Sequence, residues 1–123
     1  MSKKALILFA HGARAASWAQ PFQRLQQLTQ QSLADVKVEL AFLELMQPQL
    51  PEAVENLVHL GYKEITIAPI FLGQGGHVLR DLPLMVEELR SRYPQLQIKQ
   101  VDAAGEDPGV LHALRDYCLR AME

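Results

Sequence analysis

Two histidines each follow an apolar run of the chain, and side chains of this type could hold a metal ion or move a proton. His11 comes directly after the run Ala5–Ala10, and His77 comes shortly after the run Ile65–Leu72, behind three glycines. A neutral imidazole is a common metal ligand and a base that titrates near neutrality. Each histidine alone could be an ordinary polar loop residue. Two of them at matching positions, beside glycines that let a ligand approach the backbone, favour a shared site.

A carboxylate and a glycine-rich stretch also follow apolar runs of the chain, but each allows more than one interpretation. Glu44 follows an apolar run, where a carboxylate is costly if it is buried without a partner. A salt bridge, a position at the rim of the sheet and a role opposite the histidines all remain open for it. The stretch Gly73–Gly76 could bind an anion through backbone N–H groups, but the Gly-Lys-Ser/Thr of a P-loop does not follow it. The other histidines, His59 and His112, lie within helical patterns, and we interpret both as solvent-facing.

Strands and helices must position these residues, and the chain alternates between the two patterns. Four apolar runs predict strands at 5–10, 36–43, 65–72 and 96–101, the last polar enough for an edge strand. Short strand–helix alternation predicts an α/β fold of three layers, αβα, around a four-stranded parallel sheet. Ligands of such sheets bind beyond the carboxyl ends of the strands. In the strand order 2-1-3-4, His11 and His77 would share one edge.

Each predicted helix has an apolar face that we expect to be buried. The first helix begins between Ser17 and Pro21, and the fourth begins with Asp107 as N-cap and Pro108 in the first turn. The buried faces would be Trp18, Phe22, Leu25 and Leu28 in the first helix; Leu50, Val54, Leu57 and Val58 in the second; Leu79, Leu82, Val86, Leu89 and Tyr93 in the third; and Val110, Leu111, Leu114 and Cys118 in the fourth.

The composition narrows the classes of function. The 123 residues suit one domain, and 12 Lys and Arg against 14 Asp and Glu leave a net charge of −2, so no nucleic-acid partner is indicated. No run is long enough to span a membrane, and the N-terminal apolar run is too short for a signal peptide. With one cysteine and no intrachain disulfide, we expect a cytoplasmic protein. The motifs G-x-S-x-G, C-x-x-C and H-E-x-x-H are absent.

Four motifs, each at the end of a predicted strand, together carry a family resemblance. Residues 6–14 read LILFAHGAR, 41–45 read AFLEL, 68–77 read APIFLGQGGH, and 104–108 read AGEDP. In this order they resemble the sirohydrochlorin chelatases of the CbiX/SirB type, in the short single-domain form spanning the whole chain, 1–123. That family inserts a divalent metal into sirohydrochlorin without ATP, on the way to cobalamin or sirohaem.

The resemblance implies roles for individual residues. His11 and His77 would be the metal ligands, His11 also the proton acceptor, and Glu44 would assist proton removal or metal entry. The metal would be a substrate, Co²⁺ first with Fe²⁺ or Ni²⁺ as other choices, and no prosthetic group is implied. Ala13 stands where the family motif has serine, which removes one hydroxyl near the site. The substrate-binding residues would be Arg14, Glu44, Phe71, Leu72, Gly73, Gln74, Gly75, Gly76 and Arg80.

The resemblance also implies a homodimer. Long members of the family hold two such domains that face one cleft, whereas this chain supplies one, so two copies would present their site edges to each other. A different interpretation of the same residues is a noncatalytic carrier of metal or tetrapyrrole. A carrier would bind its ligand stoichiometrically and stop, whereas a chelatase would turn over.

Overall fold

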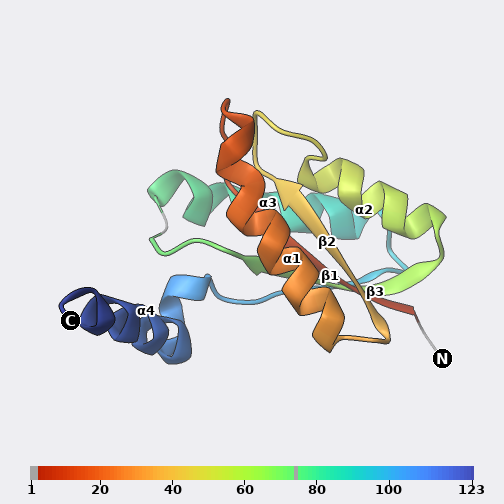
Figure 1. Ribbon diagram of the computed structural model, residues 1–123. Helices are drawn as coiled ribbons and strands as arrows, with labels where there is room; N and C mark the ends of the chain where they lie inside the picture. Colours follow the sequence, from red (N-terminus) through yellow and green to blue (C-terminus); the bar gives the residue numbers. More distant parts are fainter. Residues whose placement is uncertain (1–2, 74) are drawn as a thin grey trace.

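The computed structural model describes residues 3–73 and 75–123, apart from the side chains at positions 76, 77 and 79 (Figure 1). Helices and strands alternate along the chain as the sequence predicts. Their order is β1 (Lys3–Ala10), η1 (Ala16–Ala19), α1 (Gln20–Ser32), β2 (Val36–Phe42), α2 (Leu50–His59), β3 (Tyr62–Pro69), α3 (Gly76–Arg92), β4 (Gln97–Gln100), η2 (Ala104–Glu106) and α4 (Pro108–Ala121).

The four strands form one parallel sheet in the order β2-β1-β3-β4, which confirms the predicted α/β fold and strand order. The central strand β1 is buried over its second half, as its continuously apolar sequence requires. The short, polar β4 lies at one edge, as predicted. Among the described residues, no helix is long and apolar enough to cross a membrane.

The third strand is displaced from its predicted range of 65–72 and ends at Pro69. The N–H of Ile70 still donates to the Phe9 carbonyl of β1, at 2.8 Å. Because neighbouring backbone N–H groups of a strand point to opposite sides, the nitrogen of Pro69 faces the β4 side, where it has no hydrogen to donate. The ladder therefore stops at Pro69, and Phe71 and Leu72 belong to the loop that follows.

One face of the sheet carries α2 and α3 and holds the main core. The strands supply alternate residues to this face. Both helices turn their predicted faces toward it, with Val58 and Tyr93 only partly buried, while the side chain of Leu79 lies outside the described part of the chain. The fully buried centre consists of Ile7, Phe9, Leu50, Val54, Leu57, Ile65, Ile67 and Val86.

The opposite face is covered by α1, which packs along β2. Trp18 and Phe22 lie against Phe42, as expected. The Gln30 amide binds the edge of β2 twice, accepting from the Val38 N–H and donating to the Val36 carbonyl, both at 2.8 Å. The prediction that Leu28 is buried is wrong, since 62% of it is exposed. It follows Gln26, which also binds β2, by about 200° around the helix and so points away from the sheet.

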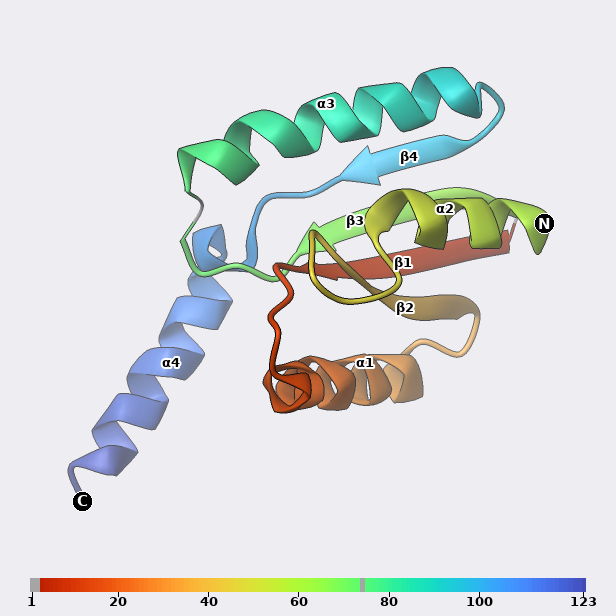
Figure 2. The ribbon, with the colours of Figure 1, turned by 90° about the horizontal axis from the view of Figure 1, so that it is seen from above.

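The last helix departs most from expectation. Asp107 is its N-cap as predicted, accepting from the Val110 N–H at 3.1 Å. None of its residues is buried, so the predicted inward face of Leu111, Leu114 and Cys118 is wrong for this chain alone. Figure 2 shows α4 running away from the sheet instead of along it. Its contacts with the rest of the described chain are concentrated on η2.

Candidate functional site

The candidate site lies where the loops leave the carboxyl ends of the four strands. The loops that follow β1 and β2 are joined through their backbones. The Leu43 N–H donates to the Ala10 carbonyl at 2.8 Å, and the Glu44 N–H donates to the His11 carbonyl at 3.1 Å. These bonds extend the β1–β2 ladder beyond the ends of the two strands. The backbone of Glu44 therefore lies beside that of His11.

Gly12 makes this close approach possible. Its φ of 95° lies in the left-handed region, and a Cβ there would overlap the backbone oxygen of Glu44. In the loop after β2, Leu45, which directly follows Glu44, also has a left-handed φ of 65°. The Met46 N–H closes a tight turn there by donating to the Glu44 carbonyl at 2.8 Å. Strained backbone of this kind concentrates at functional sites.

The imidazole of His11 is half-buried and lies on the ring of Phe71. Their centroids are 4.2 Å apart, with 33° between the ring planes. Phe71 is 3% exposed and meets Phe9 of the core edge-on at 5.8 Å. The ring nitrogens of an imidazole lie in its plane, so contact with one face leaves both free to bind a metal or a proton. Phe71 therefore fixes the ring without occupying its nitrogens.

The third and fourth loops are joined in the same manner as the first two. The Gly105 N–H donates to the Phe71 carbonyl at 2.8 Å. A Cβ on Gly105 would overlap the backbone oxygen of Leu72, so only glycine fits there. The backbone beneath His11 is thus held from the β4 side as well. Beside this junction lies a hollow of about 400 Å³, lined in part by Ile70, Val101 and Ala103.

The structure describes some of the predicted site residues in full and others only in part. Glu44 is exposed next to His11, and Phe71 lies beneath that histidine. His77 is the second residue of α3, but its side chain, like the whole of Gln74 and the surroundings of Gly76, lies outside the described part of the chain. The pairing of His11 with His77 therefore stays a prediction. The other predicted substrate residues are all exposed: Arg14, Leu72, Gly73, Gly75 and Arg80.

Sequence reasoning missed the residues that hold the site together. It named Gly12 and Gly105 only as parts of motifs, and Phe71 only as a substrate contact. Arg80 is also less free than expected, because its Nε pairs with Asp81 at 3.3 Å. Within the described residues, no three His, Cys, Asp or Glu side chains gather into a metal cluster.

Comparison with known proteins identifies the family. The profile of the CbiX family matches residues 5–121. The chain belongs to the CbiX family. A sirohydrochlorin cobaltochelatase of Methanopyrus kandleri is 32% identical over 82 residues, which are 67% of this chain and 57% of the relative. A sirohydrochlorin ferrochelatase of Bacillus subtilis is 27% identical over 112 residues, or 91% of this chain and 43% of the relative. The chain thus spans about half the length of these relatives.

Solved structures of the family share the fold. A putative cobalamin biosynthesis CbiX protein from Marinobacter aquaeolei is 29% identical and superposes with a TM-score of 0.85, covering 97% of both chains. The sirohydrochlorin chelatase SirB of Bacillus subtilis subspecies spizizenii, in complex with cobalt, is 26% identical with a TM-score of 0.76. That match covers 93% of this chain and 50% of SirB.

Proposed function

We propose that this CbiX-family chain is a sirohydrochlorin chelatase, which inserts a divalent metal into the macrocycle without ATP. The observation that carries the proposal is the His11 imidazole, held on Phe71 at the carboxyl edge of the sheet with Glu44 beside it. Its relatives named as cobaltochelatases and ferrochelatases support the same activity. Co²⁺ is the proposed metal substrate, with Fe²⁺ and Ni²⁺ as other candidates.

The proposed mechanism needs a metal that is held loosely. Two imidazoles, those of His11 and His77, would leave most coordination positions of the metal open, whereas four protein ligands would close a structural site. The macrocycle must also lose two pyrrole protons as the metal enters. The free nitrogen of His11 and the exposed carboxylate of Glu44 can both accept a proton.

Substrate binding is assigned to the exposed residues around this edge. The macrocycle is flat and bears many carboxylates, which guanidinium groups recognise well. Arg14 is exposed on the loop after β1 and fits this role, and Arg80 would exchange its contact with Asp81 for the substrate. Leu72, 62% exposed, offers an apolar surface for the ring, next to the segment 73–76.

The proposed partner is a second copy of the chain. One chain has a single set of loops, whereas the SirB match covers half of the longer chain, which leaves room there for a second unit of this size. Two copies facing each other would enclose both faces of the macrocycle. The cytoplasm is the proposed compartment, because the single cysteine, Cys118, is free and exposed, which suits a reducing environment.

The test is an anaerobic absorbance assay with catalytic amounts of protein, sirohydrochlorin, and Co²⁺, Fe²⁺ or Ni²⁺ in turn. His11→Ala and His77→Ala are the test variants, and His59→Ala, an exposed histidine on α2, is the matched control. The proposal expects many turnovers above the metal-only rate, lost in the first two variants and kept in the third. Binding of one ligand per chain without turnover would instead identify a carrier.

A further inference from the structure

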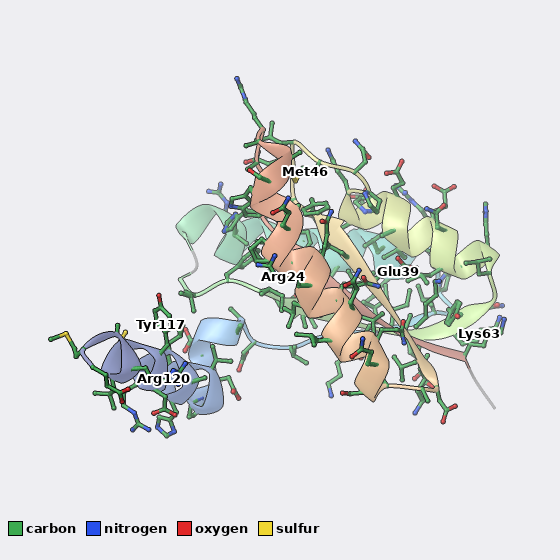
Figure 3. All side chains as sticks on the ribbon, viewed as in Figure 1. Arg24, Glu39, Met46, Lys63, Tyr117 and Arg120 are labelled. Atoms are coloured by element: carbon green, nitrogen blue, oxygen red, sulfur yellow. The ribbon has the colours of Figure 1, made fainter. Side chains whose placement is uncertain are left out.

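A hollow of about 310 Å³ lies at the edge of the sheet opposite the candidate site, and we call it the amino-edge pocket. Because the strands are parallel, β3 and β4 begin at this edge, whereas the loops of the candidate site follow the strand ends. Figure 2 shows the start of β3 and the connection from α3 to β4 together at that end of the sheet. In Figure 3, Lys63 marks this edge, well away from Met46 in the loop after β2. The lining of the pocket includes Val58, Tyr62, Lys63, Arg92, Tyr93 and Leu96.

The walls of the amino-edge pocket are held in place by the fold itself. Leu96 is buried in the main core, and Val58, Tyr62 and Tyr93 pack against the same core. The Tyr93 N–H donates to the Leu89 carbonyl and the Leu96 N–H donates to the Tyr93 carbonyl, both at 2.9 Å. These bonds close the turn between α3 and β4. A pocket whose walls are already ordered loses less conformational entropy when a ligand binds.

Two tyrosine rings give the pocket an aromatic character. Tyr62 begins β3 and Tyr93 follows α3, so the two rings come to the same hollow from different elements. Lys3 lies over the Tyr62 ring, with its Nζ 5.4 Å from the ring centre, and donates to the Leu60 carbonyl at 3.1 Å. Because Lys3 does not belong to the lining, it holds that ring from outside the pocket. Together with the aliphatic part of the lining, the two rings suit a flat apolar group.

The charged side chains of the lining are both positive. They are Lys63 and Arg92, and the lining contains no carboxylate among the residues that the structure describes. Lys63 is exposed and has no ion-pair partner within the described part of the chain. Arg92 pairs with Glu88 at 3.4 Å, but both side chains are more than half exposed, and surface pairs of this kind contribute little. Two cations beside an apolar hollow therefore complement a ligand that carries negative charge.

We propose that the amino-edge pocket binds a small aromatic carboxylate, with its ring against the two tyrosines and its carboxylate facing Lys63 and Arg92. The volume of about 310 Å³ lies at the lower end of ligand pockets, roughly 300–1,000 Å³, so it admits one or two fused rings and is too small for a tetrapyrrole. An uncharged aromatic molecule would leave both cations without a partner, and a bare anion would leave the apolar walls uncovered. The pocket is separate from the candidate site, so this proposal does not rest on the proposed chelatase activity.

The first experiment is an NMR titration of the isotope-labelled chain, free of metal and tetrapyrrole. The probe is naphthoate, and the comparison ligands are naphthamide, which lacks the charge, octanoate, which lacks the ring, and inorganic phosphate, which lacks any apolar group. We expect naphthoate to shift the amide signals of Lys63, Tyr93 and Leu96 with a Kd of about 1 mM or below. The signals of His11 and Glu44 should stay in place. Naphthamide and octanoate should each bind roughly fivefold more weakly than naphthoate.

Several results of this titration would overturn the proposal. They are the absence of shifts at the pocket amides, shifts centred on the carboxyl edge of the sheet, and equal binding of naphthoate and either naphthamide or octanoate. Phosphate that shifts the same amides as strongly as naphthoate would show a general attraction of anions to Lys63 and Arg92, and would overturn it too.

The second experiment tests whether the two cations receive the carboxylate. The test variant combines Lys63→Gln with Arg92→Gln, and the matched control is Lys99→Gln, an exposed lysine of β4 outside the lining. All three side chains are exposed, so the substitutions should leave folding unchanged. The test variant should bind naphthoate roughly tenfold more weakly and naphthamide as the wild type does, while the control keeps both affinities. A test variant that binds naphthoate like the wild type would refute the proposal. Neither experiment measures metal insertion, so this proposal and the proposed activity can fail separately.

Discussion

Replacing Gly12 by alanine should damage the site more than the same change at any other left-handed glycine in the described chain. Two glycines there have similar backbone angles, Gly12 with φ 95° and Gly61 with φ 88°. A Cβ at Gly61 would meet only the tip of the Lys3 side chain at 3.9 Å, whereas a Cβ at Gly12 would overlap the backbone oxygen of Glu44. Gly61→Ala is therefore a control that has the same conformational cost without the clash.

The expected magnitudes follow from these contacts. A left-handed alanine costs about 1–2 kcal/mol, and this cost applies to both variants. In Gly12→Ala the loop after β2 must also move away, which breaks the bonds that Leu43 and Glu44 donate to β1 and its loop, each contributing about 1 kcal/mol. Gly12→Ala should thus lose about 3–4 kcal/mol of unfolding free energy, roughly 2 kcal/mol more than Gly61→Ala.

Urea unfolding followed by circular dichroism measures the free-energy difference, and the chelatase assay measures its effect on the site. Gly61→Ala should keep its activity at temperatures where it is folded. Gly12→Ala should lose activity even when folded, because Glu44 no longer sits beside His11. Equal stabilities for the two variants, within about 0.5 kcal/mol, would refute the argument that the two loops are interlocked at Gly12.

Three other substitutions test neighbouring contacts. Gly105→Ala should destabilise the chain by about 2 kcal/mol through its clash with the Leu72 carbonyl, measured by thermal unfolding; an unchanged melting temperature would contradict that packing. Phe71→Leu should lower the rate of metal insertion more than it lowers stability, because the stack beneath His11 is lost; proportional losses in the two assays would show only a packing role. Gln30→Ala should cost about 1–3 kcal/mol in urea unfolding, since it leaves two backbone groups of β2 unpaired, while Gln31→Ala, an exposed neighbour, should cost almost nothing.

The sheet could be predicted from the sequence because burial dictates its pattern. Residues of β1 are covered on both faces, and only a continuous apolar run satisfies that position. The polar β4 could only be an edge strand. The end of β3 was harder to predict from the sequence, because Ile70 and Phe71 continue the apolar run past Pro69. Their burial comes from the loop contacts of the site, which a strand pattern does not distinguish from a ladder.

The site was predictable in outline and not in its internal contacts. Parallel strands bring their ends to one edge, so His11 and Glu44 could be expected as neighbours. That Gly12 would lie against the Glu44 carbonyl, or that Phe71 would lie beneath His11, depends on backbone paths between strands far apart in the sequence. A glycine in a motif indicates that some atom comes close, but only the fold says which one.

The fourth helix shows what an apolar pattern does and does not report. Its stripe predicts that the face through Leu111, Leu114 and Cys118 is removed from water, whereas in this chain that face is exposed. It says nothing about whether the covering surface belongs to the same chain. The rigid link at Asp107 turns α4 away from its own sheet, while the β3–β4 half of that sheet keeps one face open.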